Sequence, residues 1–341
     1  MQTDNPALIA DIGGTNARFA LVDGPGCTPL NARTLPCADF PTLVDAAQSY
    51  LDALGGSKPR HAVIAIATNV SSDRVKMTNH VWDFSVTATR ESLGLDSLKV
   101  INDYSALALA LPHLQADECV QVGGGQSCKG QPMAVLGPGT GLGVSGLITA
   151  GDHAIPLQGE GGHASYGPLT EREAGVIEII RRQFDHVSVE RLVSGPGIAL
   201  IYEAIAELDG LEIEACSPGE ITDMAVRQAS PIAQEAVAMF CGILGTTAGN
   251  LALTLGARGG IYIGGGIVHK LGEYFVDSPF RQRFEQHGRF RRYLSNIPSY
   301  VINSDYPALH GAAAALASDY QYLGVTSFDA AYRVIQQGVT D

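Results

Sequence analysis

The sequence lacks the features that mark several large protein classes. Only six of its 341 residues are cysteine, and none forms a Cys-x-x-Cys pair, so neither a zinc site nor a disulfide framework is indicated. No Gly-Lys dipeptide occurs, which excludes a Walker A phosphate loop. Basic residues are few, 22 against 35 acidic ones for a net charge of −13. Because no basic run could attract a phosphate backbone or an anionic bilayer, we expect no nucleic-acid partner and no membrane partner.

Targeting signals are also scarce. The early apolar run is interrupted by Asp11 and has no basic segment before it, unlike a secretory signal. With its unpaired cysteines, this predicts a cytoplasmic protein with reduced thiols. The uncharged stretch 236–257 is long enough to cross a membrane. It contains threonine and asparagine and has no basic or aromatic flanks, so we predict a buried core helix instead.

The length of 341 residues suggests two domains. No proline-rich, serine-rich or highly charged linker interrupts the chain, so any boundary is a compact hinge, expected near residues 109–115 and 303–311. The predicted division is a smaller α/β domain of residues 1–112 plus 304–341 and a larger α+β domain of residues 113–303.

Glycine is abundant, with 40 residues, and it is clustered. Two clusters share one design, in which a glycine- and threonine-containing turn joins two apolar strands: 7–12 with 18–22, and 133–136 with 142–148. Such turns let backbone amides converge on an anion, although a single Gly-Gly turn is also common in plain hairpins. The repetition favours a nucleotide-phosphate site and an internal duplication. The candidate phosphate-site residues are Asp11, Gly13, Gly14, Thr15, Asn16, Gly139, Thr140 and Gly141.

The spacing of apolar residues predicts the remaining elements. A helix is indicated within 40–54, and residues 170–256 are expected to be mainly helical. The other expected elements are strands at 61–67, 99–101, 261–263 and 299–302, a basic amphipathic helix at 280–293 and a last helix at 310–322.

Several polar residues are suited to a small ligand. Asn102 and Asp103 stand where a strand ends and a helix begins, so Asp103 is either a plain N-cap or a general base at the carboxyl end of the strand. Glu160 and His163 are separated by two glycines and could reach one polar ligand, or form a surface loop. Glu190 adds a carboxylate near a helix start, where pairing with an exposed arginine is the alternative. A further patch of Asn79, His80 and Trp82 is expected to be a packed loop.

In their order, these segments resemble the bacterial ATP-dependent glucokinase family, from about residue 7 to residue 320. The Cys-rich zinc motif of the related repressor and sugar-kinase group is absent. The motifs are Asp11-Ile12-Gly13-Gly14-Thr15-Asn16-Ala17-Arg18, Met77-Thr78-Asn79-His80-Val81-Trp82, Ile101-Asn102-Asp103, Gly137-Pro138-Gly139-Thr140-Gly141-Leu142-Gly143, Gly159-Glu160-Gly161-Gly162-His163, Glu190-Arg191-Leu192-Val193-Ser194-Gly195-Pro196-Gly197, Gly249-Asn250-Leu251-Ala252-Leu253 and Gly264-Gly265-Gly266-Ile267-Val268.

The resemblance implies an α/β fold of two lobes, namely an actin-like ATPase (ribonuclease H-like) fold of the hexokinase type with a cleft between the lobes. It implies phosphoryl transfer from ATP to the 6-hydroxyl of glucose, with Mg²⁺ accompanying ATP and Asp11 contacting the ion through water. The residue matching the family's base is Asp103. The positions matching sugar ligands are Asn102, Asp103, Glu160, His163 and Glu190; the two turns receive phosphates, and Gly265 and Gly266 lie by the adenosine.

One segment departs from the family pattern. After the strand that ends near Ala67, the family usually has a small residue followed by proline, whereas this chain has Thr68-Asn69-Val70-Ser71-Ser72. Since that loop approaches the sugar in the family, two alternatives stay open: a kinase for mannose, fructose or an N-acetylated sugar, and a catalytically weak sugar-binding sensor. A homodimer also stays open.

Overall fold

The structure, a computed structural model, describes residues 6–25, 28–78, 80–150 and 153–317. Asn79 and the end of the predicted helix 310–322 lie outside the described residues. The chain divides into two compact units: unit 1 comprises Met1–Leu114, Asp152–Pro156 and Asp305–Asp341, and unit 2 comprises Gln115–Gly151 and Leu157–Ser304. The domain boundaries expected from the sequence stay a prediction.

Unit 1 is built on a five-stranded sheet with the order β3-β2-β1-β4-β7. Its first three strands pair antiparallel, and β1, β4 and β7 are parallel. The sheet strands are β1 (Ala7–Ile12), β2 (Asn16–Val22), β3 (Leu30–Pro36), β4 (His61–Ile66) and β7 (Ser97–Asn102). Unit 1 also contains a small hairpin, β5 (Arg74–Lys76) and β6 (Asp83–Ser85), and the α-helices α1 (Leu43–Asp52), α2 (Val86–Ser92), α3 (Asp103–Ala110) and α13 (Pro307–Ala317).

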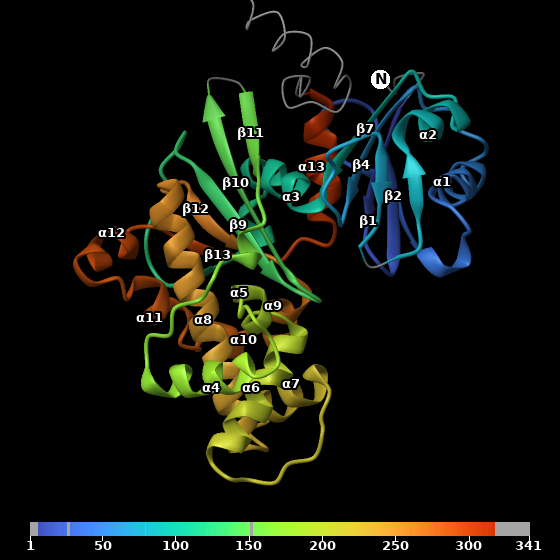
Figure 1. The fold of residues 1–341 in the computed structure, drawn as a ribbon. Helices are drawn as coiled ribbons and strands as arrows, with labels where there is room; N and C mark the ends of the chain where they lie inside the picture. Colours follow the sequence, from blue (N-terminus) through green and yellow to red (C-terminus); the bar gives the residue numbers. More distant parts are fainter. Residues whose placement is uncertain (1–5, 26–27, 79, 151–152, 318–341) are drawn as a thin grey trace, which may run out of the picture. The chain divides into compact units, whose positions relative to one another are not determined.

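Helix α13 returns to unit 1 late in the chain and packs against α3 (Figure 1). Both helices are rich in alanine, and small side chains let helix backbones approach closely. The approach is closest at Gly311, where an added Cβ would lie 1.7 Å from the backbone oxygen of Ala106. The segment that follows unit 2 therefore completes the core of unit 1.

The second sheet has six strands in the order β11-β10-β9-β12-β13-β8. All of them lie in unit 2 except the first part of β11, because residues 152–156 belong to unit 1. The strands are β8 (Cys119–Val122), β9 (Met133–Pro138), β10 (Leu142–Ala150), β11 (His153–Gln158), β12 (Gly260–Ile263) and β13 (Ser299–Ile302). As in unit 1, an antiparallel hairpin is followed by two parallel strands on the side of its first strand. This shared order supports the internal duplication expected from the two glycine hairpins.

The predicted hairpins are confirmed, and the predicted strand boundaries differ from the observed ones by at most two residues. The helical segment of unit 2 is also present. Its helices are α4 (Glu171–Arg181), α5 (Val189–Leu192), α6 (Gly195–Leu208), α7 (Pro218–Val226) and α8 (Pro231–Leu255), followed after β12 by α9 (Gly266–Leu271), α10 (Glu273–Val276), α11 (Phe280–Glu285) and α12 (Arg291–Ser295).

Serine and threonine side chains explain where many of these helices begin, because each accepts a hydrogen bond from one of the first free backbone amides. Proline at the first helical position supports the start of α8, and Gly256 ends that helix in a left-handed conformation with φ of 60°. The capping residues are Thr42, Ser85, Thr170, Ser188, Ser194, Ser217 and Ser230.

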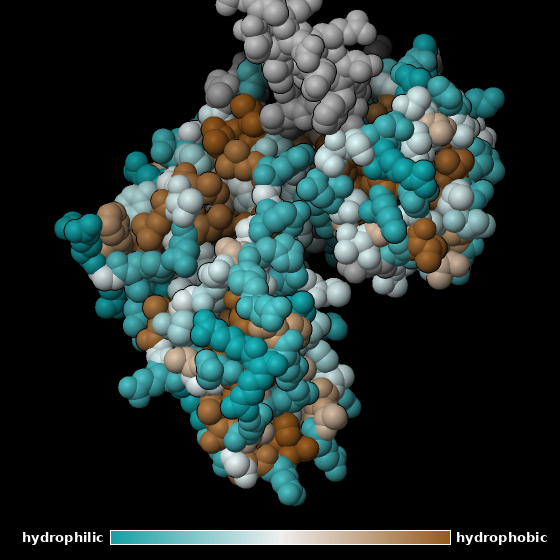
Figure 2. Space-filling view, in the orientation of Figure 1, coloured by the Kyte–Doolittle hydropathy of each residue, from teal (hydrophilic) through white to brown (hydrophobic). Residues whose placement is uncertain are grey.

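By length and composition alone, α8 could cross a membrane. In the structure, 67% of its most apolar stretch is buried, and the helix packs against α6, α7 and α11. Its residues belong to the main hydrophobic core of unit 2, and the visible face of the surrounding helical part is mostly hydrophilic (Figure 2). The prediction of a buried core helix is confirmed.

The single amphipathic helix predicted at 280–293 is wrong. The segment forms two short helices, α11 and α12, separated by a 3₁₀ turn over Gly288–Phe290. Gly288 has a φ of 54°, a left-handed conformation that an α-helix cannot accommodate. The alternation of basic and apolar residues continues through Gly288, so the sequence pattern did not indicate that the helix ends there.

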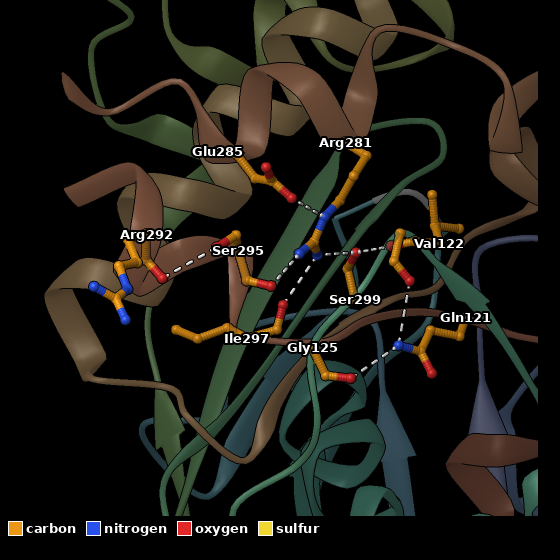
Figure 3. A network of polar contacts seen from close by, with 10 residues as sticks. Gln121, Val122, Gly125, Arg281, Glu285, Arg292, Ser295, Ile297 and Ser299 are labelled. Carbon is orange, nitrogen blue, oxygen red and sulfur yellow. Dashed lines mark hydrogen bonds and ion pairs between the residues drawn. The ribbon is translucent and has the colours of Figure 1, made fainter. Parts of the chain in front are cut away.

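Arg281 connects the segments on either side of this break to the sheet (Figure 3). Its guanidinium donates to the backbone oxygens of Ser295 and Ile297 at 3.2 and 3.0 Å. It also donates to Oγ of Ser299 at 3.0 Å, and that hydroxyl donates to the backbone oxygen of Val122 at 2.7 Å. One side chain of α11 is thereby bonded to β13, and the Ser299 hydroxyl that it contacts adds a link from β13 to the edge strand β8.

A second arginine of α11 forms a buried ion pair with α4. Nη1 of Arg283 lies 2.5 Å from Oε1 of Glu173, and the two side chains are 12% and 3% exposed. The other oxygen of Glu173 accepts from the Tyr166 hydroxyl and the Leu169 amide. Burial raises the pKa of the Glu173 carboxyl. The hydrogen bonds, of which the one from Arg283 has the largest effect, outweigh burial and bring that pKa below its usual value.

Candidate functional site

The predicted site residues of unit 1 gather at one edge of its sheet. In register, Ile12 of β1 pairs with Ile66 of β4, and Ile66 pairs with Asn102 of β7. These are the carboxyl ends of the three parallel strands. The glycine turn after β1, the loop after β4 and Asp103 after β7 therefore lie along the same edge, where open α/β sheets bind ligands.

The turn between β1 and β2 is closed by a hydrogen bond of 2.9 Å from the Gly13 amide to the Asn16 oxygen. Among the described residues, the backbone amides of Gly14 and Thr15 have no hydrogen-bond acceptor, and Thr15 is exposed. Neither glycine has a positive φ, so close approach of a ligand explains them better than backbone strain. The turn presents free donors of the kind that bind an anion.

Asp11, just before this turn, faces Arg18 across the hairpin. One guanidinium nitrogen of Arg18 donates to Oδ2 of Asp11 at 2.9 Å. Burial raises the pKa of the Asp11 carboxyl, and the charge of Arg18 acts in the opposite direction. Arg18 was not among the predicted site residues; its position seven residues after Asp11 in a tight hairpin was a signal for this pair.

Asn102, not Asp103, is the N-cap of α3. Oδ1 of Asn102 accepts from the amides of Tyr104 and Ser105 at 2.9 and 3.1 Å. The N-cap interpretation of Asp103 is therefore wrong, because the preceding residue takes that position. The side-chain nitrogen Nδ2 of Asn102 donates to the Thr68 backbone oxygen and to Oδ1 of Asp103 at 3.3 and 2.9 Å. Asn102 therefore links Asp103 to the Thr68–Ser72 loop, which departs from the family pattern.

The Asp103 carboxyl is poised for proton transfer near neutral pH. Burial, followed by the negative charge of Asp11, raises its pKa from 3.8 to about 7, against the hydrogen bonds from Tyr104 and Asn102. Both hydrogen bonds reach Oδ1. Among the described residues, Oδ2 has no donor, so it is the oxygen that can accept a proton from a ligand.

In unit 2, the turn between β9 and β10 has a comparable construction. The Gly139 amide donates to the Gly141 oxygen, and the Gly139 oxygen accepts from the Gly195 amide at the start of α6, both at 2.8 Å. Within the described part of the chain, the amides of Thr140 and Gly141 have no acceptor. Thr140 is exposed, so this turn also presents free donors.

Glu190 lies on α5 and contacts this turn directly. Its Oε2 accepts from the Leu142 amide at 2.8 Å. The alternative in which Glu190 pairs with an exposed arginine is wrong, because Arg191 instead lies over the Phe184 ring, 4.1 Å from its centre. Figure 1 shows α5 and α9 beside the turn end of the β9–β10 hairpin.

Glu160 precedes a 3₁₀ turn over Gly161–His163 that packs on β10, and His163 is the last residue of that turn. Both side chains are exposed, and so are Gly265 and Gly266, which join β12 to α9. An added Cβ on Gly265 would lie 2.3 Å from the Pro138 backbone oxygen. The β12–α9 junction therefore packs directly against the end of β9.

Among the described residues, no group of three or more His, Cys, Asp or Glu side chains is arranged to hold a metal ion. The site nevertheless fits a hydrated Mg²⁺ that accompanies a phosphate ligand, because such an ion needs only one or two protein carboxylates. The charge of Asp11 raises the pKa of Asp103, so the two carboxylates repel each other at this edge. A divalent cation would relieve that repulsion.

Trp82 is packed as expected: it is 2% exposed, and its Nε1 donates to the Phe40 oxygen at 3.1 Å.

The predicted site residues fall into two groups, one in each unit. Unit 1 holds Asp11, Gly13, Gly14, Thr15, Asn16, Asn102 and Asp103, and unit 2 holds Gly139, Thr140, Gly141, Glu160, His163, Glu190, Gly265 and Gly266.

Comparisons with known proteins identify the family. The sequence profile of the family described as Glucokinase matches residues 8–319. The glucokinase of Aromatoleum aromaticum is 54% identical over 312 residues, which cover 91% of this chain and 94% of that protein. The bifunctional protein glk of Burkholderia pseudomallei is 53% identical over 92% of this chain, which spans about half (49%) of its length.

A solved structure agrees with these relatives. The glucokinase from an Antarctic psychrotroph is 36% identical and superposes with a TM-score of 0.84, covering 92% of this chain and 98% of that one. Matches of this extent and identity leave one conclusion: the chain belongs to the glucokinase family.

Proposed function

We propose that this protein is a glucokinase that transfers the γ-phosphoryl group of ATP to the 6-hydroxyl of glucose, giving glucose 6-phosphate and ADP. Membership of the family supports the activity, and Asp103 is the observation that carries the mechanism. Its carboxyl has a pKa raised to about 7 and one oxygen without a donor among the described residues. An alcohol must lose its proton as it attacks phosphorus, and such a carboxylate can accept it.

The other residues position the two substrates. Asn102, Glu160, His163 and Glu190 would bind sugar hydroxyls. The turns Gly13–Asn16 and Gly139–Gly141 would bind ATP phosphates through their free amides and threonine hydroxyls, and Gly265 and Gly266 would lie by the adenosine. Since phosphoryl transfer demands little covalent chemistry of the protein, this positioning is the main contribution of the chain.

The divalent ion is proposed to be Mg²⁺. Asp11 would hold it through water, using the oxygen that Arg18 does not contact. When bound with ATP, the ion neutralises charge on the phosphate oxygens. We further propose that the units form the two lobes of a hexokinase-type, actin-like fold with residues 1–112 plus 304–341 and 113–303 as domains. Their shared strand order supports it. A cytoplasmic location agrees with the free cysteines of the described residues.

The alternative substrate is a hexose other than glucose, and the observation that favours this alternative is the position of the Thr68–Ser72 loop. Thr68 contacts Asn102 through its backbone oxygen, so the loop that departs from the family pattern adjoins the proposed sugar site. Mannose, fructose and N-acetylated sugars are therefore tested beside glucose.

A coupled ADP-release assay with glucose and five other hexoses, each with and without Mg-ATP, tests the proposal. We expect glucose to give the highest kcat/KM and no turnover without the nucleotide or without Mg²⁺. A higher kcat/KM for another hexose would reassign the substrate. Glucose binding without turnover, measured by calorimetry on the same preparation, would contradict the kinase and favour a sensor.

A further inference from the structure

Leu142, the residue that follows the Gly139–Gly141 turn of unit 2, is bonded to Glu190, one of the side chains proposed to bind the sugar. Oε2 of Glu190 accepts from the Leu142 amide at 2.8 Å, and among the described residues Oε1 has no partner. The contact is tight, because an added Cβ on Gly141 would lie only 2.5 Å from the same Oε2. Glu190 therefore has one oxygen on the turn and one oxygen available to a ligand.

Two other side chains proposed to bind the sugar, Glu160 and His163, belong to a segment that contacts the same residue, Leu142. Gly162, which lies between Glu160 and His163, would place an added Cβ 2.3 Å from the Leu142 backbone oxygen. Leu142 itself is 5% exposed. Its amide thus contacts the Glu190 side chain while its carbonyl contacts the Glu160–His163 turn. A displacement of either contact would move the peptide that closes the Gly139–Gly141 turn.

We propose that Glu190 couples the sugar and nucleotide sites of unit 2, so that the position of the Gly139–Gly141 turn sets the affinity for glucose and the loss of Glu190 lowers the affinity for nucleotide. The inference rests on the proposed glucokinase function. Coupling between two ligands is reciprocal in binding free energy. A change made in the phosphate turn must therefore appear in sugar binding, even when no nucleotide is present.

The first test compares two alanine substitutions in the phosphate turn. In Gly141→Ala the new methyl group displaces the Glu190 carboxylate, whereas in Gly139→Ala the methyl group meets nothing within 4 Å. Neither glycine has a positive φ, so neither substitution strains the backbone. By calorimetry without nucleotide, we expect Gly141→Ala to raise the Kd for glucose about 5- to 50-fold, within the range typical of coupled sites, and Gly139→Ala to leave it unchanged.

The second test runs in the opposite direction. Glu190→Ala removes a proposed sugar-binding side chain and the acceptor of the Leu142 amide. Glu160→Ala removes a proposed sugar-binding side chain that, within the described part of the chain, forms no hydrogen bond to the turn. We expect both variants to weaken glucose binding. Without sugar, only Glu190→Ala should weaken binding of a non-hydrolysable ATP analogue, by about 5-fold or more.

Each outcome decides a separate question. If wild type binds no glucose, the proposed function fails. If wild type binds glucose and Gly141→Ala matches Gly139→Ala, or if Glu190→Ala and Glu160→Ala bind the ATP analogue equally well, the coupling is refuted. Thermal unfolding identifies a variant that does not fold, and the Glu190→Ala and Glu160→Ala pair then decides alone.

Discussion

Replacing Asp103 with asparagine should make unit 1 more stable at alkaline pH while it removes most of the activity. Folding raises the pKa of this carboxyl from 3.8 to about 7, so the folded state holds its proton more tightly than the unfolded state. The resulting stabilisation is fully present below pH of about 3.8 and is lost as the pH rises through about 7. Asparagine stays neutral at every pH and keeps an oxygen for the Tyr104 amide, so the variant avoids this loss.

The size of the effect follows from the pKa. A rise from 3.8 to about 7 corresponds to about 4 kcal/mol, at about 1.4 kcal/mol for each pKa unit. The Asp103 side chain keeps partial access to solvent, which makes this value an upper bound. We expect the free energy of unfolding of Asp103→Asn, relative to wild type, to be about 1–3 kcal/mol higher at pH 8 than at pH 5.

The chain offers a specific probe for this measurement. Trp82 is its one tryptophan and is buried in unit 1, the unit that contains Asp103. Urea unfolding followed by tryptophan fluorescence at pH 5 and pH 8 therefore reports on the correct unit. Parallel pH dependence of wild type and variant would show that Asp103 titrates normally and would refute the reasoning.

The same substitution should lower the catalytic rate, although it raises stability at alkaline pH. Removing a general base lowers kcat by about 10²- to 10⁴-fold, with glucose affinity changed much less. In wild type, kcat/KM for glucose should fall as the pH drops below about 7, the pKa of the Asp103 carboxyl. A folded Asp103→Asn variant with near-wild-type kcat would eliminate Asp103 as the base.

Three further predictions concern other parts of the chain. Restoring the family pattern with Thr68→Ala and Asn69→Pro should lower the KM for glucose about two- to fivefold, since a compatible proline limits chain freedom by about 0.4–1 kcal/mol; an unchanged KM in steady-state assays would show that the loop does not affect affinity. Gly311→Ala should lower the free energy of unfolding of unit 1 by about 3 kcal/mol or more in urea titrations, because the methyl group overlaps a backbone oxygen of α3. Arg283→Met should cost about 3–5 kcal/mol of unfolding free energy by leaving the buried Glu173 carboxylate unpaired. Arg182 forms an exposed ion pair with Glu207, so Arg182→Met should cost less than about 1 kcal/mol; equal costs would contradict this.

Local patterns in the sequence predicted much of the fold and supplied the candidate site residues. Glycine turns between short apolar strands identified both hairpins, and the strand-to-helix junction at Asn102 and Asp103 drew attention to Asp103, the proposed base. The sequence could not decide which of these two neighbours caps α3, because asparagine and aspartate are equally good caps. The contact of Glu190 with Leu142 joins residues 48 positions apart, and no local spacing encodes such a contact.

The break at Gly288 shows a different limit. A glycine inside an amphipathic pattern is compatible with a continuous helix at a cost of about 1 kcal/mol, so the pattern alone favoured one helix over 280–293. In the folded chain, the contacts of Arg281 with Ser295, Ile297 and Ser299 require the segment to turn back toward β13. Tertiary hydrogen bonds therefore outweigh the local helical preference.

The late return of α13 to unit 1 has a consequence for synthesis on the ribosome. Ala106 of α3 is translated about 205 residues before Gly311, the residue it packs against. At about 5–20 residues per second, the growing chain waits about 10–40 s for that partner. All of unit 2, which ends at Ser304, is translated within this interval. Unit 2 can thus fold while the alanine-rich face of α3 is still uncovered, whereas unit 1 completes its packing only after all of unit 2 has been translated.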